Sequence, residues 1–163
     1  MNCLENSTLR RVQVIADYQF GKGVGVELFP DECEYTFSTT GRVRQILLKS
    51  KRLATVRAGD GRLTLGIMGA ERLHHIRPPP GYRVIILDEV GDFIASGKNA
   101  FSKHILSADP IIRAGDEVLV VKSGDILLGT GTAMISGAEM LAFNYGLAVK
   151  VRQGRSSICY PEE

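Results

Sequence analysis

The run GKNAFSKHILSADPIIRAGDEVLVVKSGDILLGTGTAMISGAEMLAFNYGLAVKVR, residues 97–152, alternates strand-length segments with turn signals. The turn signals are Asp-Pro at 109–110 and two Gly-Asp turns, at 114–116 and 123–125. The segments between them are rich in β-branched residues, which favours strands. Strands are therefore expected at residues 101–106, 116–122, 126–135 and 147–152. Short strands that recur every 8 to 12 residues or so are typical of a small barrel.

One helix is expected inside this run, after the third strand. Ser136 and Glu139 have the spacing of a capping box, and Gly146 stands at the expected C-cap position. Upstream, the sequence Arg-Pro-Pro-Pro-Gly at residues 77–81 forms a stiff spacer that cannot continue a helix or enter the centre of a sheet. A buried-looking strand at residues 82–88 follows it. The spacer is therefore the best candidate for a domain boundary.

The first half of the chain is expected to form helices and an antiparallel meander. Leu9, Val12, Ala16 and Phe20 recur at helical spacing, after N-cap candidates at residues 6–8. Helices are expected at residues 9–20, 24–29 (or a turn there) and 70–75. Strands are expected at residues 34–38, 42–48, 53–57 and 62–67, with a hairpin signal at Asp60-Gly61. The expected fold class is α+β: an antiparallel sheet with helices on one face, then a small barrel.

Length and composition exclude several protein classes. The chain has 163 residues and a net charge of +2. Hydrophobic residues make up 44% of it and charged residues 23%, close to the averages for soluble globular proteins. Its longest uncharged apolar runs have four residues, far from the roughly 20 of a membrane span. Its N-terminus has no signal-peptide core, and Cys3, Cys33 and Cys159 form no CxxC pair. We therefore expect a cytoplasmic protein without a disulfide framework.

Catalytic and cofactor motifs are absent from the sequence. His74 and His75 are neighbours and cannot share one helix face, and His104 stands alone. No HExxH, GxSxG or GxxxxGK[ST] motif occurs. The glycines of residues 21–26 lack the third glycine of GxGxxG, and those of 129–131 are more typical of a bulge or a bend. We therefore expect no catalytic residue, no metal and no cofactor.

Basic residues gather at two places in the second half of the chain. Residues 97–104 hold two lysines, a histidine, an amide and an aromatic ring beside a glycine turn. Lys150 and Arg152 alternate with apolar residues on the last strand, so they should point outward on one face. Both groups suit contacts to RNA phosphates. The same outward charges are also expected of any soluble protein, because charged side chains face solvent.

A further basic cluster lies in the first half of the chain, where no acidic residue interrupts it between Tyr35 and Gly59. Its members are Arg42, Arg44, Lys49, Lys51, Arg52 and Arg57. The cluster could extend a positive surface for phosphates, face a protein partner, or be a solvated face.

The second half resembles a PUA domain, the RNA-binding module of pseudouridine synthases and archaeosine transglycosylases. The segments that carry the resemblance are GKNAFSKHI (97–105), SADP (107–110), IRAGDEVLVV (112–121), LLGTGTA (127–133), SGAEML (136–141) and GLAVKVR (146–152). The first half resembles the domain that precedes PUA in archaeal archaeosine tRNA-guanine transglycosylases. Its matching segments are ADYQFGKGVGVELFP (16–30), TGRVRQILL (40–48) and LATVRAGDGRLTLGIMGAERL (53–73).

The resemblance implies a pre-PUA α+β domain at residues 1–77, a PUA pseudo-β-barrel at 82–154 and a tail at 155–163. It also implies binding to tRNA by its acceptor stem and 3′ end, with no DNA or membrane as partner. The implied RNA-binding residues are Gly97, Lys98, Asn99, Lys103, His104, Lys150 and Arg152. Phe101 is expected in the barrel core, with stacking on an unpaired base as the alternative.

The main departure from those enzymes concerns their catalytic domain. They carry a catalytic (β/α)8 barrel with a zinc site, for which 163 residues leave no room. We therefore expect an RNA-binding protein without catalytic activity of its own. The alternatives are a non-catalytic subunit that works beside a separate transglycosylase subunit, and a protein–protein adaptor.

Overall fold

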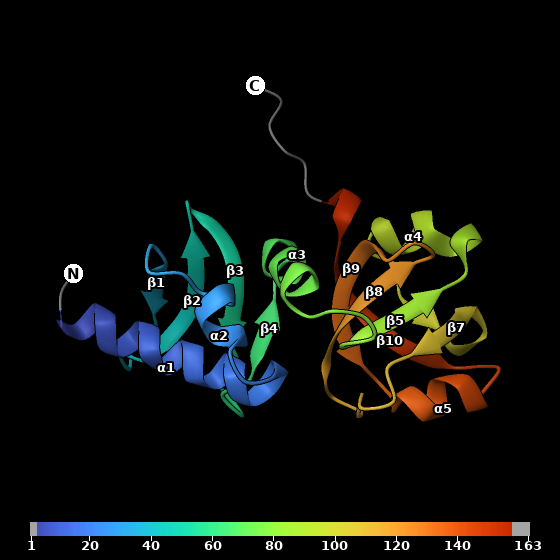
Figure 1. Cartoon of the computed structure of the whole chain (residues 1–163), viewed down its shortest axis with the longest axis horizontal. Coiled ribbons are helices and arrows are strands. Elements are labelled where there is room, and N and C mark those ends of the chain that lie inside the picture. Colours follow the sequence, from blue (N-terminus) through green and yellow to red (C-terminus); the bar gives the residue numbers. More distant parts are fainter. Residues whose placement is uncertain (1–2, 158–163) are drawn as a thin grey trace, which may run out of the picture. The chain divides into compact units, whose positions relative to one another are not determined.

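The computed structural model describes residues 3–157, which divide into two compact units with the boundary between Arg77 and Pro78 (Figure 1). Each unit contains a sheet with its own helices, so the expected α+β fold class is confirmed. Within these residues, no helix combines the length and the apolar character that a membrane span requires.

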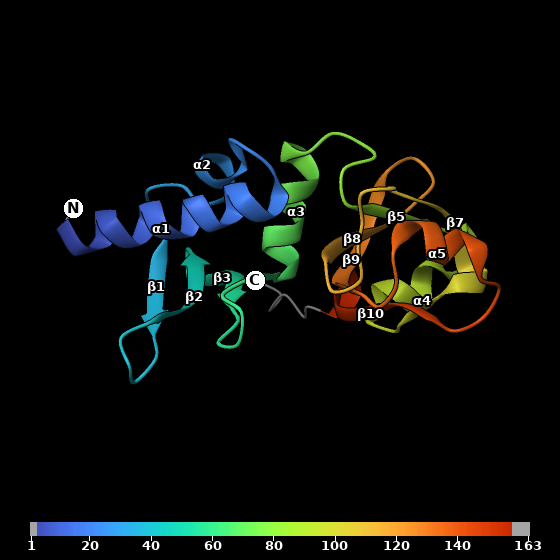
Figure 2. The same cartoon turned by 90° about the horizontal axis from the view of Figure 1, so that it is seen from below.

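The N-terminal unit is an antiparallel sheet with helices packed against it (Figure 2). Its strands are β1 (Glu34–Phe37), β2 (Val43–Leu48), β3 (Lys51–Val56) and β4 (Leu63–Leu65), which lie in chain order. Its helices are α1 (Cys3–Phe20), α2 (Val24–Leu28) and α3 (Ile67–Ile76). The predicted stripe on the first helix is confirmed, because Leu9, Val12, Ala16 and Phe20 are all buried.

Three elements of this unit begin earlier than the sequence predicts. α1 begins at Cys3, so the N-cap candidates lie inside the helix, where Thr8 Oγ1 donates to the carbonyl oxygen of Leu4 (2.9 Å). β3 begins at Lys51, because Lys49 and Ser50 alone make the preceding turn, with φ of 51° and 63°. Two residues with positive φ match the right-handed twist of a hairpin. α3 begins at Ile67 rather than at residue 70.

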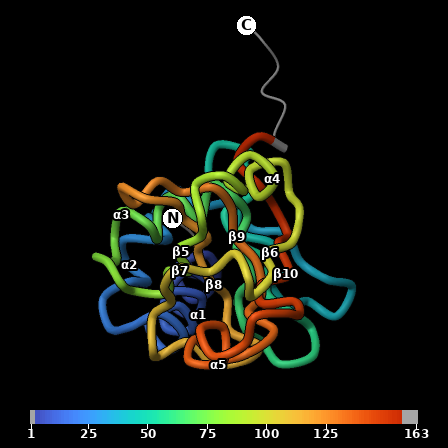
Figure 3. Tube along the Cα trace, turned by 90° about the vertical axis from the view of Figure 1, so that its right-hand side faces the viewer, coloured from blue at the N-terminus to red at the C-terminus, as the bar shows by residue number. Residues whose placement is uncertain are grey.

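The C-terminal unit is a mixed sheet that curls into a near-barrel (Figure 3). Its strands are β5 (Arg83–Ile86), β6 (Ala100–Phe101), β7 (Ile105–Ala108), β8 (Glu117–Lys122), β9 (Ile126–Ala133) and β10 (Leu147–Gly154). Their order is β6-β10-β9-β8-β5-β7, with β5 parallel to β8 and the other pairs antiparallel. The two edge strands, β6 and β7, are joined by a short 3₁₀ turn at Ser102–His104. The expected pseudo-barrel is therefore confirmed.

This turn corrects the prediction of one strand at residues 101–106. A continuous strand cannot belong to both edges of a sheet, so the chain leaves β6, turns and enters β7. A short helix that the sequence did not predict, α4 (Gly91–Ala95), packs against β9 and β10. Small β-branched side chains, among them Val84, Val120 and Val149, fill the barrel core.

The predicted helix after β9 is present as α5 (Gly137–Ala142). Its capping box is confirmed: Ser136 Oγ accepts from the Glu139 N–H (3.2 Å), and Glu139 Oε2 accepts from the Ser136 N–H (2.8 Å). The C-cap is Phe143 in an extended conformation, so the prediction of Gly146 as the C-cap is wrong. An exposed loop separates α5 from Gly146, which has a φ of 89°.

Candidate nucleic-acid interface

The structure brings the two basic groups of the second half side by side. β6 pairs with β10, with Phe101 opposite Leu147 and Ala100 opposite Val149. Before β6, the Asn99 Oδ1 accepts a hydrogen bond from the N–H of Val151 (3.0 Å). Residues 97–104 therefore follow the edge of the strand that carries Lys150 and Arg152, as Figure 3 shows for β6 and β10.

A pocket of about 470 Å³ opens between α4 and this segment. Its lining residues are Val90, Phe93, Ile94, Gly97, Lys98, Asn99, Phe101 and His104. Lys98 Nζ lies 5.3 Å from the centre of the Phe93 ring, a cation–π contact that holds a positive charge at the rim. An apolar pocket with a cation at its rim suits a flat aromatic base followed by a phosphate.

Phe101 is exposed, so the prediction that it lies in the barrel core is wrong. Its exposed fraction is 42%, whereas that of Ala100 is 0%. Successive strand residues face opposite sides of a sheet, and Ala100 takes the inward position. The Phe101 ring instead packs edge-on against His104, with the ring centres 6.2 Å apart, and forms a wall of the pocket.

Asn99 and Gly97 shape the pocket through the backbone. The side-chain oxygen of Asn99 satisfies the N–H of Val151 at a point where the pairing of β10 is irregular. Gly97 has a φ of 96°, a conformation that strains any residue with a Cβ. Its N–H donates to the Ile94 carbonyl (2.9 Å), which closes α4 onto the loop.

His104 lines the pocket and also has an unsatisfied buried polar atom. Its Nδ1 is buried and has no hydrogen-bond partner among the described residues, and the same holds for Ser102 Oγ in the same turn. Buried polar atoms usually have a partner, so these two atoms are exceptions within the turn that joins β6 to β7.

The outward cations of this region differ in their partners. Lys103 and Lys150 are exposed, and no ion pair joins either to another described residue. Arg152 instead pairs with the buried Glu117, with Nη1–Oε2 at 2.5 Å and Nη2–Oε1 at 3.0 Å, and also donates to Thr132 Oγ1 (2.9 Å). Arg152 is exposed, as its place on the strand predicts, and the same guanidinium also neutralises a buried carboxylate.

The basic cluster of the first half lies on β2, β3 and their flanking turns. Its arginines at 42, 44 and 57 line a hollow of about 720 Å³ together with the hydroxyl residues Ser38, Thr40 and Thr55. Arg57 is paired with Asp60, at 2.5 Å and 3.1 Å, and Arg52 donates to Thr55 Oγ1 (3.3 Å). Part of the cluster's charge is therefore already engaged within the unit.

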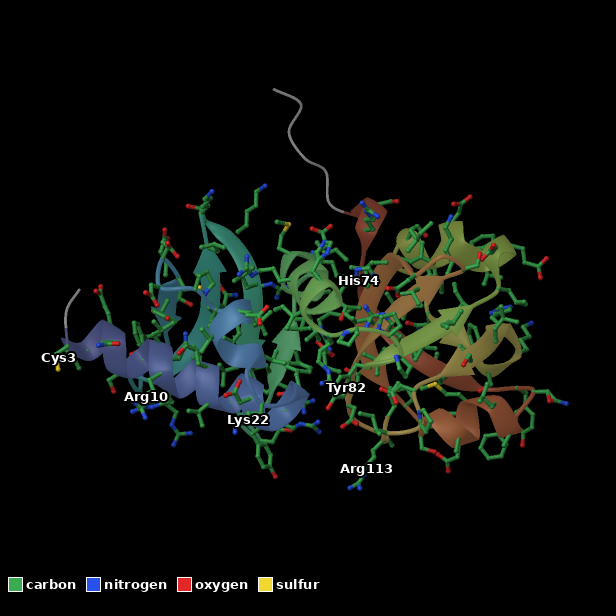
Figure 4. All side chains as sticks on the ribbon, viewed as in Figure 1. Cys3, Arg10, Lys22, His74, Tyr82 and Arg113 are labelled. Atoms are coloured by element: carbon green, nitrogen blue, oxygen red, sulfur yellow. The ribbon has the colours of Figure 1, made fainter. Side chains whose placement is uncertain are left out.

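The described residues contain no group of three side chains that could hold a metal ion. Burial raises the pKa of the Cys33 thiol to about 11 and that of the Tyr35 hydroxyl to about 12. Both shifts favour the neutral, unreactive form of the side chain. Cys3 is exposed at the start of α1 (Figure 4), and Cys159 and most of the predicted tail lie outside the described residues.

Sequence reasoning missed the apolar half of the pocket. Val90, Phe93 and Ile94 lie in a stretch, residues 88–96, where no helix was predicted. The available signal was the pair of apolar residues at 93 and 94 before the Ser96-Gly97 stop, which is typical of a short helix that ends at glycine.

Comparison with known protein families agrees with this geometry. The patch-forming domain C2 of tRNA-guanine transglycosylase matches residues 10–80, and the PUA domain matches residues 82–155. The chain is a C2 domain joined to a PUA domain. The resemblance inferred from the sequence is thereby confirmed, and the two units are called the C2 unit and the PUA unit below.

Curated relatives of the C2–PUA pair are archaeal enzymes. The chain is 50% identical over 150 residues to the tRNA-guanine(15) transglycosylase of Pyrococcus abyssi and 51% identical over 150 residues to that of Pyrococcus furiosus. Each match covers 92% of this chain but 25% of the relative, so the chain spans about a quarter of the length of these enzymes.

Solved structures show the same fold. A hypothetical protein from Pyrococcus horikoshii, PH0734.1, aligns with a TM-score of 0.70 and 22% identity, over 91% of this chain and 90% of that chain. A conserved PUA domain protein from Thermoplasma acidophilum aligns with a TM-score of 0.63 and 20% identity, over 92% and 89% of the two chains. The C2–PUA arrangement of secondary structure is therefore shared with other archaeal chains of similar length.

Proposed function

We propose that this C2–PUA chain binds structured RNA, most specifically the acceptor stem and 3′ end of tRNA, and performs no chemistry of its own. The observation that carries the proposal is the pocket beside β10, where an apolar floor, an exposed aromatic ring and a lysine meet. The curated relatives, which act on tRNA by name, support tRNA as the RNA class.

In this proposal each residue of the interface has its own role. Lys98, Lys103 and Lys150 meet phosphates, and the pocket wall formed by Phe101 and His104 takes an unpaired base. Gly97 lets the backbone approach the sugar–phosphate chain closely. Contacts to shape and backbone suit A-form RNA, whose deep major groove hides the base edges. We therefore propose no DNA partner.

The rest of the chain is proposed to support this interface. We assign the pre-PUA domain to residues 1–77, the PUA domain to 82–154 and a tail to 155–163. The hollow with Arg42, Arg44 and Arg57 is proposed as additional phosphate-binding surface, and the protein is proposed to act in the cytoplasm.

Removing one phosphate contact should weaken the salt dependence of RNA binding by a fixed amount. Each of Lys103→Ala and Lys150→Ala should lower the magnitude of the slope of log affinity against log salt by about 0.7 to 0.9. The measurement is a titration of the full chain with tRNA at several salt concentrations.

The matched control for this titration is Lys22→Ala. Lys22 is exposed on the C2 unit, after the end of α1 (Figure 4). It belongs neither to the two basic groups of the second half nor to the basic cluster of the first half. This variant should reproduce the slope of the unaltered chain. If Lys103→Ala and Lys150→Ala do the same while the chain binds tRNA, the assignment of these residues is wrong.

A second candidate function is that of a non-catalytic subunit beside a separate transglycosylase subunit. The observation that favours it is that the chain corresponds to about a quarter of the length of proteins named tRNA-guanine(15) transglycosylases. Guanine exchange into tRNA that requires both the chain and a transglycosylase lacking this region would support it. RNA binding whose affinity does not depend on salt, or the absence of RNA binding, would instead favour a protein–protein adaptor.

A further inference from the structure

An exposed aromatic loop follows α5 in the PUA unit. All residues from 141 to 146 are exposed, including Phe143 at 44% and Tyr145 at 80%. The two rings lie against each other, with centres 6.4 Å apart and planes inclined by 37°. None of the sequence-predicted RNA contacts lies in this loop.

The loop is attached directly to the candidate RNA interface. The carbonyl oxygen of Gly146 accepts a hydrogen bond from the N–H of Ser102 (2.9 Å), and Leu147 pairs with Phe101. Tyr145 directly precedes Gly146 and Lys103 directly follows Ser102, so the loop and the 3₁₀ turn adjoin at this hydrogen bond. The segments that carry an exposed ring and an exposed cation are therefore joined at this point, and the cation, Lys103, has no ion-pair partner among the described residues.

We propose that Phe143 and Tyr145 form a platform on which unpaired nucleotides of the bound RNA stack, next to the pocket. The inference rests on the proposed RNA binding and names single-stranded nucleotides as the part of the RNA that this loop binds. An aromatic face binds any base by stacking, and the phosphate of the stacked nucleotide comes within reach of the neighbouring lysine. Exposed rings on a segment joined to the one that carries Lys103 combine apolar and positive surface, which complements a nucleotide better than a purely apolar protein partner.

The test compares two RNA probes of one hairpin, a blunt form and a form with an unpaired 3′ extension of a few nucleotides that carries 2-aminopurine. In the full chain, Tyr145→Ala should weaken binding of the extended probe by about 5- to 150-fold, the range expected for one lost base stack. Binding of the blunt probe should stay within about twofold. Tyr145→Phe keeps the ring and should retain binding of both probes and the quenching of 2-aminopurine fluorescence.

Tyr18→Ala is the matched control, because Tyr18 is exposed to 94% on α1 of the C2 unit. It should leave both probes unaffected. Equal loss on both probes after Tyr145→Ala, or no loss on the extended probe, would overturn the stacking platform and leave the loop to a protein partner. If the unaltered chain binds neither probe, the proposed RNA binding itself fails, and that result is distinct from the other two.

Discussion

Replacing Gly154 with alanine is expected to destabilise the PUA unit by about 1–3 kcal/mol, the usual cost of forcing a group into packed structure. A Cβ at this position would lie 2.2 Å from the carbonyl oxygen of Ala95 and 2.6 Å from the nitrogen of Gly97. Both atoms belong to the backbone, so rotation of a side chain cannot relieve the overlap. The chain at residues 95–97 must move away from β10.

The same movement should reduce RNA affinity, because Gly97 and Lys98 form part of the pocket wall. Urea unfolding of the full chain, with hydrogen exchange read at the amides of β9 and β10, measures the loss of stability. Gly59→Ala is the control: Gly59 is exposed, no atom lies within 4 Å of an added Cβ, and its φ is not positive. Similar behaviour of the two variants would contradict the close backbone contact at Gly154.

The strands of the PUA unit could be predicted because local signals mark their ends. Asp109 shows how such a signal works: its carboxylate accepts hydrogen bonds from the N–H groups of Tyr82 (2.8 Å) and Ile111 (3.2 Å). The Asp-Pro turn therefore also fastens the start of β5. Capping by Ser136 and Glu139 is equally local, since both partners lie within one turn of helix.

What the sequence could not predict depends on contacts between distant residues. The break between β6 and β7 exists because the two segments lie at opposite edges of one curled sheet. The outward position of Phe101 follows from the same geometry, since β6 contributes only two residues and Ala100 occupies the interior. Neither fact is visible in the alternation of residues 101–106.

Only part of the candidate site could be predicted, because its remaining contacts also join distant residues. Lys103 and Lys150 could be assigned to the surface, because charged residues remain exposed unless they are paired. The carboxylate that pairs with Arg152 comes from Glu117, 35 residues earlier, and is brought opposite by the pairing of β8, β9 and β10. Periodicity within one strand places a charge outward but does not show which partner it meets there.

Replacing Arg152 with alanine is therefore expected to lower the stability of the PUA unit primarily, and RNA binding only secondarily. The side chain of Glu117 is exposed to only 3%, and removal of the guanidinium takes away the cation that pairs with this buried carboxylate in the unaltered chain. Breaking a buried pair costs about 3–5 kcal/mol, but water reaches the 28% exposed side chain of Arg152. We therefore expect a loss of about 2–3 kcal/mol in the free energy of unfolding.

A second substitution separates the two effects. Glu117→Gln in the Arg152→Ala background replaces the buried carboxylate with a neutral amide, so part of the lost stability should return. Lys150→Ala, an exposed lysine on the same strand, should change stability by less than about 0.5 kcal/mol. If Arg152→Ala unfolds at the same urea concentration as Lys150→Ala while lowering the salt slope of tRNA binding, then Arg152 is a phosphate contact and its pairing with Glu117 contributes little to stability.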